Sequence, residues 1–383
     1  MTPKLIGDVC EVIAGQSPKS SFYNKDGDGL PFYQGKKEFS DKYIGKPTTW
    51  TTKVTKEAFK DDILMSVRAP VGPVNYATEH MCIGRGLAAI RAGKEIDKEY
   101  LFYFLIHHEN QIVGNIGAVF NSINKKQIEN LEILLPETLK EQKQIVSTLD
   151  KAFKQIDQAK ANLEQNLHNA KELFQSKLNE VFSQRGEGWV EKRLNEITTK
   201  LGDGLHGTPK YTEDGEYYFI NGNNLDNGKI IFKDKTKRVS VAEYEKYKKP
   251  LNNRTVFVSI NGTLGNVAFY NNEKIMLGKS ACYFNLIEEV DKEFIKYFIQ
   301  NPSLYKYLHT SATGATIKNV SLKTMRGLKI NLPSLKKQNE IVKELDKFST
   351  LSNELQNHYQ QKLNNLEELK KSILQKAFRG ELT

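Results

Sequence analysis

Residues 331–346 read NLPSLKKQNEIVKELD, and the chain almost repeats this stretch as LLPETLKEQKQIVSTLD at 134–150. In both places an apolar, strand-like run ends at a proline, and a turn follows it, which is basic in 331–346. Apolar residues then recur at helical spacing, which predicts the start of a helix. One protein therefore builds the same strand-to-helix junction twice, almost two hundred residues apart.

The junction belongs to a longer internal repeat. Upstream, GAVFNSINKKQIENLEILLP (117–136) matches GATIKNVSLKTMRGLKINLP (314–333). Further upstream, ILMSVRAPVG (63–72) matches VFVSINGTLG (256–265). This period is far too long for a solenoid, so the sequence predicts two copies of one domain-sized unit.

Each copy has a globular part and a helical part. The globular part contains short β-branched and aromatic runs broken by Gly, Pro, Asn and Asp, which predict an α/β or α+β domain. The helical part of the first copy has neither proline nor glycine from Thr138 to about Gln184. The predicted divisions are a globular domain at 1–137, a long helix at 138–185, a second globular domain at 189–334 and a second long helix at 335–380.

The apolar stripes on the two helices predict that the helices pair with each other. A long helix with a narrow apolar stripe needs a partner, and the short connection RGEGW (185–189) favours a second helix that returns alongside the first. We therefore expect an antiparallel coiled coil and pseudo-two-fold symmetry between the copies. The predicted seam consists of Ile145, Leu149, Ile156, Leu163, Leu167, Phe174, Leu178, Ile341, Leu345, Phe348, Leu355, Leu363, Leu366 and Ile373.

Composition narrows the class of protein. The 383 residues are too many for one compact core, and the formal charge of +10 favours a polyanionic partner. The three cysteines lie far apart without a CxxC motif, which excludes a disulfide framework and a thiolate zinc site. No apolar run has membrane-spanning length and the start lacks a signal-peptide core, so the expected location is the cytoplasm.

The duplicated architecture resembles the specificity subunit of type I restriction-modification systems. The resemblance rests on G-A-x-x-x-x-[IV] before strands ending in ILLP and INLP, on the helix start L-K-x-Q-x-x-I-V-x-x-L-D, and on the C-terminal SILQKAFRGELT. It covers the full chain, in family order. It implies that each globular domain is a target recognition domain for one half of a bipartite DNA site. It also implies that the helices set the unread gap between the halves.

The same resemblance implies the partners. Two modification subunits, which carry S-adenosylmethionine and methylate adenine N6, would dock on the helices. Two restriction subunits, which are motor-nucleases using ATP and Mg, would join to cleave unmodified DNA. This chain would bind double-stranded DNA, no membrane and no cofactor of its own, and would supply no catalysis.

The residues independently lack a catalytic motif. The string nearest to the Asn/Asp-Pro-Pro-aromatic loop of an N6-adenine methyltransferase is NPSLYKY (301–307), which we interpret as a capped helix start. GDGLHG (202–207) matches G-x-G-x-x-G, but Thr208 and Pro209 follow it and no helical pattern begins, which argues against a nucleotide loop. The seven histidines are scattered, so no metal site is predicted.

Candidate DNA contacts are polar side chains on the turn-rich segments of each globular domain. Base edges are read by Arg, Lys, Asn, Gln and Ser, whereas phosphate contacts mainly fix register. Corresponding positions differ, as Arg68 differs from Asn261 and Gln34 from Asn221, so we expect an asymmetric site. Any one of these residues could instead be an ordinary turn residue. The candidates are Lys19, Gln34, Lys36, Lys37, Arg68, Asn121, Ser122, Lys125, Lys210, Asn221, Asn223, Asn224, Asn261, Lys318 and Asn319.

Two other functions are compatible with the residues. A coiled-coil scaffold with two protein-binding or glycan-binding heads would share the architecture, although the basic charge counts mildly against it. A stand-alone DNA-modifying enzyme would need a catalytic loop that the sequence lacks.

Overall fold

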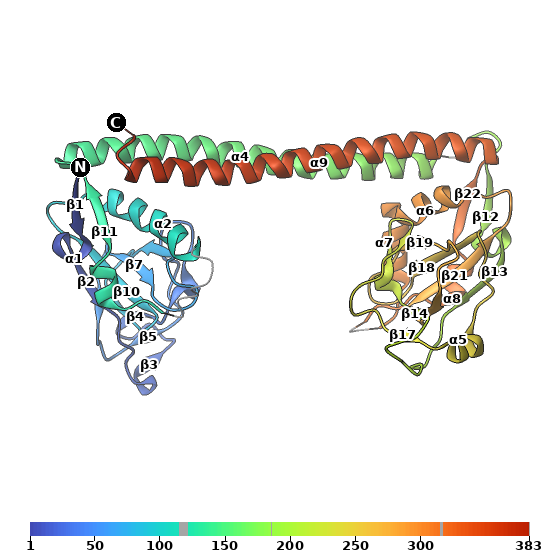
Figure 1. Ribbon diagram of the computed structural model, residues 1–383, viewed down its shortest axis with the longest axis horizontal. Helices are drawn as coiled ribbons and strands as arrows, with labels where there is room; N and C mark the ends of the chain where they lie inside the picture. Colours follow the sequence, from blue (N-terminus) through green and yellow to red (C-terminus); the bar gives the residue numbers. More distant parts are fainter. Residues whose placement is uncertain (115–121, 185, 315–316, 383) are drawn as a thin grey trace. The chain divides into compact units, whose positions relative to one another are not determined.

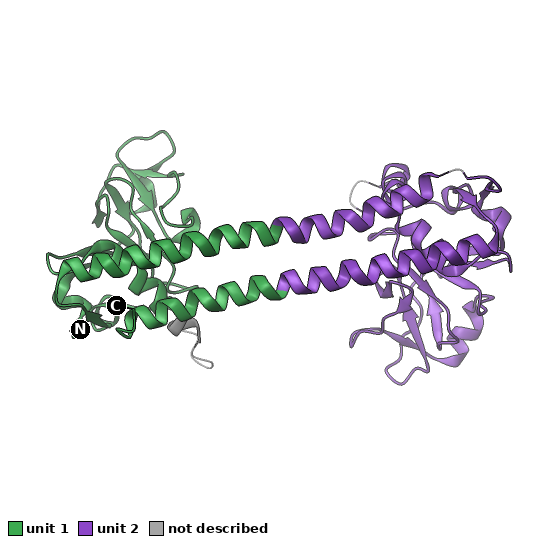
Figure 2. Cartoon of the chain, turned by 90° about the horizontal axis from the view of Figure 1, so that it is seen from above, with its two compact units in different colours: residues 1–164, 361–383 green, residues 165–360 purple. Residues whose placement is uncertain are grey.

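The computed structural model describes residues 1–114, 122–184, 186–314 and 317–382. The chain divides into two compact units (Figure 2): unit 1 is Met1–Glu164 with Gln361–Thr383, and unit 2 is Gln165–Gln360. Each unit contains a globular part of mixed strands and helices, as the sequence predicted. Each also contains segments of both long helices, α4 (Leu139–Ser183) and α9 (Leu335–Phe378).

The globular part of unit 1 is built on two small sheets and a strand pair. The four-stranded antiparallel sheet has the order β2 (Cys10–Ala14), β10 (Leu87–Ala92), β7 (Ile63–Ser66), β8 (Val74–Tyr76). The second sheet has the order β3 (Tyr23–Asn24), β5 (Trp50–Thr51), β4 (Leu30–Tyr33), β9 (Met81–Ile83), β6 (Glu57–Ala58). The strand pair is β1 (Thr2–Leu5) with β11 (Glu132–Leu135), and the helices are α1 (Ile6–Val9), α2 (Lys98–Gly114) and α3 (Lys125–Glu129).

Unit 2 repeats the four-stranded sheet and the strand pair, whereas its second sheet has three strands instead of five (Figure 1). Its four-stranded antiparallel sheet has the order β13 (Thr198–Asp203), β21 (Ala281–Leu286), β18 (Thr255–Ser259), β19 (Val267–Phe269). A smaller sheet has the order β17 (Arg238–Val239), β14 (Tyr217–Ile220), β20 (Ile275–Leu277). The remaining elements are β12 (Val190–Arg193) paired with β22 (Lys329–Leu332), β15 (Leu225–Asp226) paired with β16 (Lys229–Ile230), and α5 (Val241–Tyr247), α6 (Lys292–Gln300), α7 (Pro302–Ser311) and α8 (Leu322–Arg326).

Both four-stranded sheets are covered on their two faces. In β7, Ile63 and Met65 pack in the core that contains α2 and the long helices, whereas Leu64 packs against the second sheet. In β18, Val256 and Phe257 divide between two cores in the same way. A strand buried on both faces is a continuous apolar run rather than an alternating one, which accounts for ILMS and TVFVS.

The repeated junction places a buried glutamine at the start of each long helix. The side chain of Gln142 accepts a hydrogen bond from the Asp97 N–H (2.7 Å) and donates one to the Glu95 carbonyl (2.9 Å). Gln338 does the same with the N–H of Asp291 (2.8 Å) and the carbonyl of Glu289 (3.0 Å). In both units the glutamine therefore fastens the loop before α2 or α6 to the long helix.

A tyrosine-aspartate hydrogen bond repeats this fastening two turns further along each helix. The Tyr103 hydroxyl of α2 donates to the carboxylate of Asp150. In unit 2 the Tyr297 hydroxyl of α6 donates to Asp346 over 2.6 Å. Burial raises the pKa of both tyrosines well above their ordinary value, and the neighbouring carboxylate raises it further, so both hydroxyls keep their protons and remain donors.

The two long helices lie antiparallel within each unit. In unit 1 the Lys160 ammonium is 2.7 Å from the Glu367 carboxylate, and Leu374 joins the core that contains Leu149. In unit 2 the Ser352 hydroxyl donates to the Ala170 carbonyl over 2.9 Å. The predicted seam residues are all buried or half-buried in the structure. The fully buried ones are Ile145, Leu149, Ile156, Leu178, Ile341 and Leu345, and the half-buried ones are Leu163, Leu167, Phe174, Phe348, Leu355, Leu363, Leu366 and Ile373.

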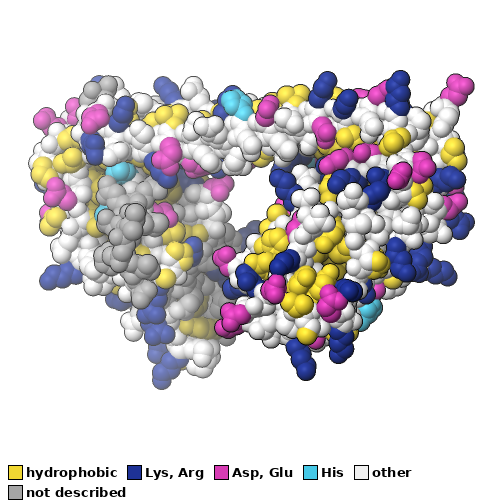
Figure 3. Space-filling view, turned by 45° about the vertical axis from the view of Figure 1, so that its right-hand side comes forward, with side chains coloured by type: hydrophobic (Ala, Val, Ile, Leu, Met, Phe, Trp, Pro, Cys, Tyr) yellow, Lys and Arg dark blue, Asp and Glu magenta, His cyan; other side chains and the backbone are white. Residues whose placement is uncertain are grey.

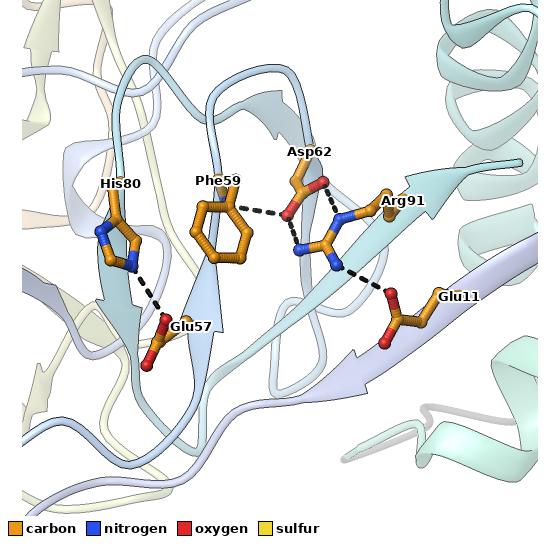
Figure 4. Close-up of polar contacts among 6 residues, drawn as sticks. All are labelled: Glu11, Glu57, Phe59, Asp62, His80 and Arg91. Carbon is orange, nitrogen blue, oxygen red and sulfur yellow. Dashed lines mark hydrogen bonds and ion pairs between the residues drawn. The ribbon is translucent and has the colours of Figure 1, made fainter.

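We call the four-stranded sheet of each unit its main sheet. The two copies differ in the polar pair that joins the two central strands of this sheet. In unit 1, Arg91 donates to both carboxylate oxygens of buried Asp62, at 2.9 and 2.8 Å, and reaches Glu11 at 2.7 Å (Figure 4). A bidentate, charge-assisted pair of this kind is among the strong hydrogen-bonded contacts. In unit 2 the corresponding pair is neutral, because Thr255 donates to the side-chain oxygen of Asn285 over 2.7 Å.

We expect Gln142→Leu to lower the free energy of unfolding of unit 1 by roughly 2–4 kcal/mol, because two backbone groups lose their partner in a partly buried junction. Urea titration followed by hydrogen exchange, which resolves amides of unit 1 from those of unit 2, measures the change. Gln155→Leu, at an exposed position of the same helix, is the control and should stay within about 0.5 kcal/mol of the wild type. Equal effects of the two substitutions would contradict the role of the buried amide.

Candidate nucleic-acid interface

The loops at one end of the main sheet of unit 1 are joined by backbone hydrogen bonds. This is the end where β2 and β7 finish and where β10 begins. We call residues 15–19, 34–37, 67–72, 84–86 and 122–123 the loop cluster of unit 1. Its bonds run from the N–H of Gln16 to the carbonyl of Ile83 (3.0 Å), from Gly84 to Tyr33 (2.8 Å), from Val67 to Gly86 (3.0 Å) and from Ile123 to Val67 (3.0 Å).

Unit 2 forms a matching set of bonds at the same end of its main sheet. The loop cluster of unit 2 comprises residues 204–210, 221–224, 260–265, 278–280 and 317–320. Because the bonds are made by backbone groups, the side chains can differ between the copies without changing the loop positions. The bonds run from the N–H of Leu205 to the carbonyl of Leu277 (2.8 Å), from Gly278 to Ile220 (2.8 Å), from Ile260 to Ser280 (2.9 Å) and from Val320 to Ile260 (2.8 Å).

Two pairs of candidate residues that are distant in sequence come together in these clusters. Arg68 and Ser122 face each other across an isolated antiparallel bridge, and both side chains are exposed. Asn261 and Asn319 form the same bridge in unit 2, and the Asn261 amide donates to the Asn319 side-chain oxygen over 3.3 Å. One position therefore presents arginine with serine in unit 1 and two asparagines in unit 2.

Gln34 and Asn221 occupy a second shared position. The side-chain oxygen of Gln34 accepts from the Ser17 hydroxyl, and that of Asn221 accepts from the Ser280 hydroxyl, each over 3.0 Å. Each side chain therefore keeps its amide NH2 group for another acceptor, and acceptors are what the purine N7 and guanine O6 edges offer in the major groove.

A glycine beside each of these amides makes room for it. A Cβ on Gly278 would meet the side-chain oxygen of Asn221 at 2.3 Å. In unit 1 a Cβ on Gly84 would meet the Cα and the side-chain oxygen of Gln34 at 3.0 Å. The glycine of the repeated strings IGRG (83–86) and LGKS (277–280) is therefore a packing requirement of the loop cluster.

The same strings carry two residues that sequence analysis missed. Arg85 and Lys279 follow the glycine in the two copies, and both side chains are exposed. The Arg85 N–H donates to the Ser17 hydroxyl over 3.1 Å, and the Lys279 N–H donates to the Leu205 carbonyl over 3.0 Å, so both stand inside the loop clusters. Alignment of IGRG with LGKS would have revealed a cation at one register in both copies.

The other candidates vary in how available they are. Lys125 forms an ion pair with Glu129 at 3.5 Å. Burial raises the pKa of Glu109, and the positive charge of nearby Lys36 partly offsets this rise. Asn224 is buried, and its amide donates to the Ile231 carbonyl over 2.9 Å, which gives it a structural role. Asn121 lies outside the described residues. The exposed candidates are Lys19, Lys36, Lys37, Lys125, Lys210, Asn223 and Lys318.

The motifs set aside in the sequence have structural roles. Asn301 caps α7, since its side chain accepts from the N–H groups of Ser303 (2.9 Å) and Leu304 (3.2 Å) and Pro302 occupies the first turn. Residues 202–207 leave β13 without entering a helix. Within the described ranges, no three His, Cys, Asp or Glu side chains gather as a metal ion would require. Nor does any helix of those ranges have the length and apolar character needed to cross a bilayer.

Comparison with known protein families shows which family the chain belongs to. The family model described as the type I restriction modification DNA specificity domain matches residues 1–169 and 186–365. The chain belongs to this family. Two matched copies also agree with the internal repeat, and the predicted family and fold class are both confirmed. As a specificity subunit, the chain belongs to the DNA-recognising part of a type I system and not to its catalytic parts.

Individual specificity subunits resemble the chain to different extents. A putative type I restriction enzyme MjaX specificity subunit of Methanocaldococcus jannaschii is 44% identical over 171 residues, which are 44% of this chain and 39% of that protein. The EcoBI specificity subunit of Escherichia coli is 21% identical over 407 residues, covering 98% of this chain and 85% of the relative. The second match extends over both copies of the repeat.

Solved structures share the fold. A chain from a structure of a type I R-M system described for its complex assembly and conformational transition aligns with a TM-score of 0.78 at 19% identity, covering 100% of this chain and 98% of that one. The HsdS subunit of Thermoanaerobacter tengcongensis aligns with a TM-score of 0.60, also at 19% identity, covering 100% of this chain and 97% of that one.

We expect Arg68→Ala in the specificity subunit to cost roughly 1–3 kcal/mol of binding to the preferred DNA and to relax one base position in a single half-site. Selection from a duplex library randomised across both half-sites measures the change. Asn261→Ala is the matched variant and should relax a position in the other half-site. A uniform loss of affinity on all sequences would instead identify Arg68 as a phosphate contact.

Proposed function

We propose that each unit reads one half of an asymmetric bipartite DNA site, using its loop cluster. The observation that carries this proposal is the matched backbone of the two clusters combined with their different side chains. Arg68 and Ser122 offer a guanidinium and a hydroxyl where Asn261 and Asn319 offer amides. Since these groups prefer different base edges, equal half-sites are not expected.

We further propose that α4 and α9 set the unread gap between the half-sites. Both helices are uninterrupted, with 45 residues in α4 and 44 in α9. At ~1.5 Å per residue each helix is on the order of 65–70 Å long, about the length of 20 base pairs of duplex.

The same helices are proposed to dock two modification subunits. Leucines with 55%, 52% and 47% of their surface exposed lie on them at Leu173, Leu351 and Leu369. Figure 3 shows hydrophobic side chains at intervals along these helices, between charged side chains of both signs. These leucines lie outside the predicted seam, so their apolar surface is accessible to a partner. On this proposal S-adenosylmethionine belongs to the modification subunits, and ATP and Mg to two restriction subunits that complete the complex.

Two other functions would suit the architecture less well. A scaffold with protein-binding or glycan-binding heads does not account for the cations repeated at Arg85 and Lys279. A stand-alone DNA-modifying enzyme would need a catalytic centre, and the membership of the specificity family argues for a recognition role instead.

Methylome sequencing of a host with and without this chain tests the half-sites. We expect methylated adenine in a motif with two different halves, separated by unspecified bases, only when the chain is present together with its modification subunits. A palindromic motif would contradict the asymmetric assignment, and an unchanged methylome would contradict the proposed function.

Insertion of seven residues into both long helices tests the gap. The insertions follow Glu164 in α4 and Gln360 in α9, at the limits of the two units, and add about 10 Å of helix. We expect the gap to lengthen by about three base pairs at ~3.4 Å per pair while both half-sites stay the same. A gap of unchanged length would contradict the role of the helices as a spacer. The control inserts seven residues of Gly and Ser after Glu187, in the connection between the helical and globular parts.

A further inference from the structure

Unit 2 carries a basic segment that sequence analysis did not single out. Residues 231–238 read IFKDKTKR and lead from β16 into β17. Asp234 is the one carboxylate among them, so cations outnumber it four to one. The four cations are Lys233, Lys235, Lys237 and Arg238. The side chains of these four residues are exposed, and none of them forms an ion pair with a carboxylate in the described part of the chain.

Hydrogen bonds hold this basic segment against the loop cluster of unit 2. The Ile231 N–H donates to the Asn224 carbonyl over 2.7 Å, and the Asn224 side chain donates back to the Ile231 carbonyl over 2.9 Å. At the other end the Phe219 N–H donates to the Lys237 carbonyl over 2.8 Å. Since Phe219 lies two residues before Asn221, the basic segment begins and ends beside the loop that carries a proposed base contact.

A pair of aromatic rings restrains the last cation of the segment. The ring of Tyr218 is 4.5 Å from the ring of Phe232, and the guanidinium of Arg238 lies 4.5 Å from the centre of the Tyr218 ring. An arginine side chain loses conformational entropy when it binds a ligand. A guanidinium that already lies on an aromatic ring has less of this entropy left to lose. Arg238 is therefore prepared to hold an anionic group at the edge of the loop cluster.

The corresponding segment of unit 1 carries fewer cations. Its β5, β4 and β9 correspond to β17, β14 and β20, because in both units the middle strand pairs antiparallel with the first and parallel with the last. Residues 42–50 lead into β5 as residues 230–238 lead into β17, and they contain Lys42 and Lys46. Lys42 is paired with Glu99 at 2.8 Å, whereas Lys46 is exposed. Unit 2 thus has four exposed cations where unit 1 has one exposed, unpaired lysine.

We propose that residues 231–238 bind the phosphate backbone of duplex DNA beside the half-site read by unit 2. Unit 2 then supplies more of the sequence-independent affinity than unit 1. Phosphate is the occupant that the surface fits, because the cations are exposed, form no ion pair with a carboxylate of the described residues and adjoin the loop cluster. This inference rests on the proposed function and adds a contact that positions the DNA without reading it.

The test measures how binding of the full chain to a random-sequence duplex depends on salt. Each lysine that leaves a phosphate contact lowers the slope of log K against log salt by about 0.9, so K233Q/K235Q/K237Q is expected to reduce the slope by about 2 to 3. Fluorescence anisotropy at a series of KCl concentrations gives the slope. The half-site sequences selected from a randomised library should be those of the wild type.

Three controls make the result specific. K336Q/K343Q/K347Q removes the same charge from exposed positions of α9 in the same unit and should leave the slope within about 0.5 of the wild type. Lys46→Gln in unit 1 should lower the slope of log K against log salt by at most about 0.9. Thermal unfolding checks that every variant is folded.

The outcomes separate this inference from the proposed function. If K233Q/K235Q/K237Q and K336Q/K343Q/K347Q gave equal slopes of log K against log salt, the phosphate contact would be overturned, because only the net charge of the chain would then matter. A changed half-site preference would overturn its sequence-independent role. A wild-type chain that fails to bind duplex DNA would overturn the proposed function itself.

Discussion

The buried glutamine at the start of each long helix is the contact on which the rest of the structure depends. Gln142 and Gln338 each bind both a backbone donor and a backbone acceptor of the globular part. A side-chain amide that satisfies two backbone groups at once tolerates little displacement, since hydrogen bonds weaken steeply with distance and angle. The tyrosine-aspartate bond two turns along adds a second point, and two points on a rigid helix fix how the globular part is oriented on it.

That fixed mounting allows the reading surface to vary. The loop clusters are held by backbone groups, and the glycines at 84 and 278 keep space for whichever amide stands opposite. The sheet beneath them has also diverged, from the charged pair of Asp62 and Arg91 to the neutral pair of Thr255 and Asn285, without a change in strand order. Recognition residues can therefore change while the frame that presents them does not.

The internal repeat explains how much was predictable from sequence. Alignment of the copies placed Arg68 opposite Asn261 and Ser122 opposite Asn319, because the turn signals around them are repeated. It could not show that the members of each pair meet across a bridge, since some fifty residues separate them along the chain. Contacts between such distant segments come from the tertiary fold rather than from local pattern.

Local pattern misled in identifiable ways. Asn224 resembles a groove contact because it is an amide in a polar turn, yet its side chain folds back to the Ile231 carbonyl. Residues 231–238 resemble a solvated charge run until their backbone contacts place them beside Asn221. On α9 the predicted stripe continued to Ile373, whereas Leu374 is the more deeply buried of the two. A straight helix drifts by about 20° per heptad against a 3.5-residue repeat, so a stripe extended over many turns changes its most buried position.

The unequal charge of the two units has a consequence for how a bipartite site is bound. When two heads are tethered, the first to bind converts the second event into an intramolecular one at high effective concentration. Phosphate contacts act on any sequence and at long range, whereas base contacts act only in register. If unit 2 holds the backbone through residues 231–238, unit 1 can discriminate among sequences with little intrinsic affinity of its own. Division of affinity and discrimination between duplicated heads would then explain why the copies share a frame but not a surface charge.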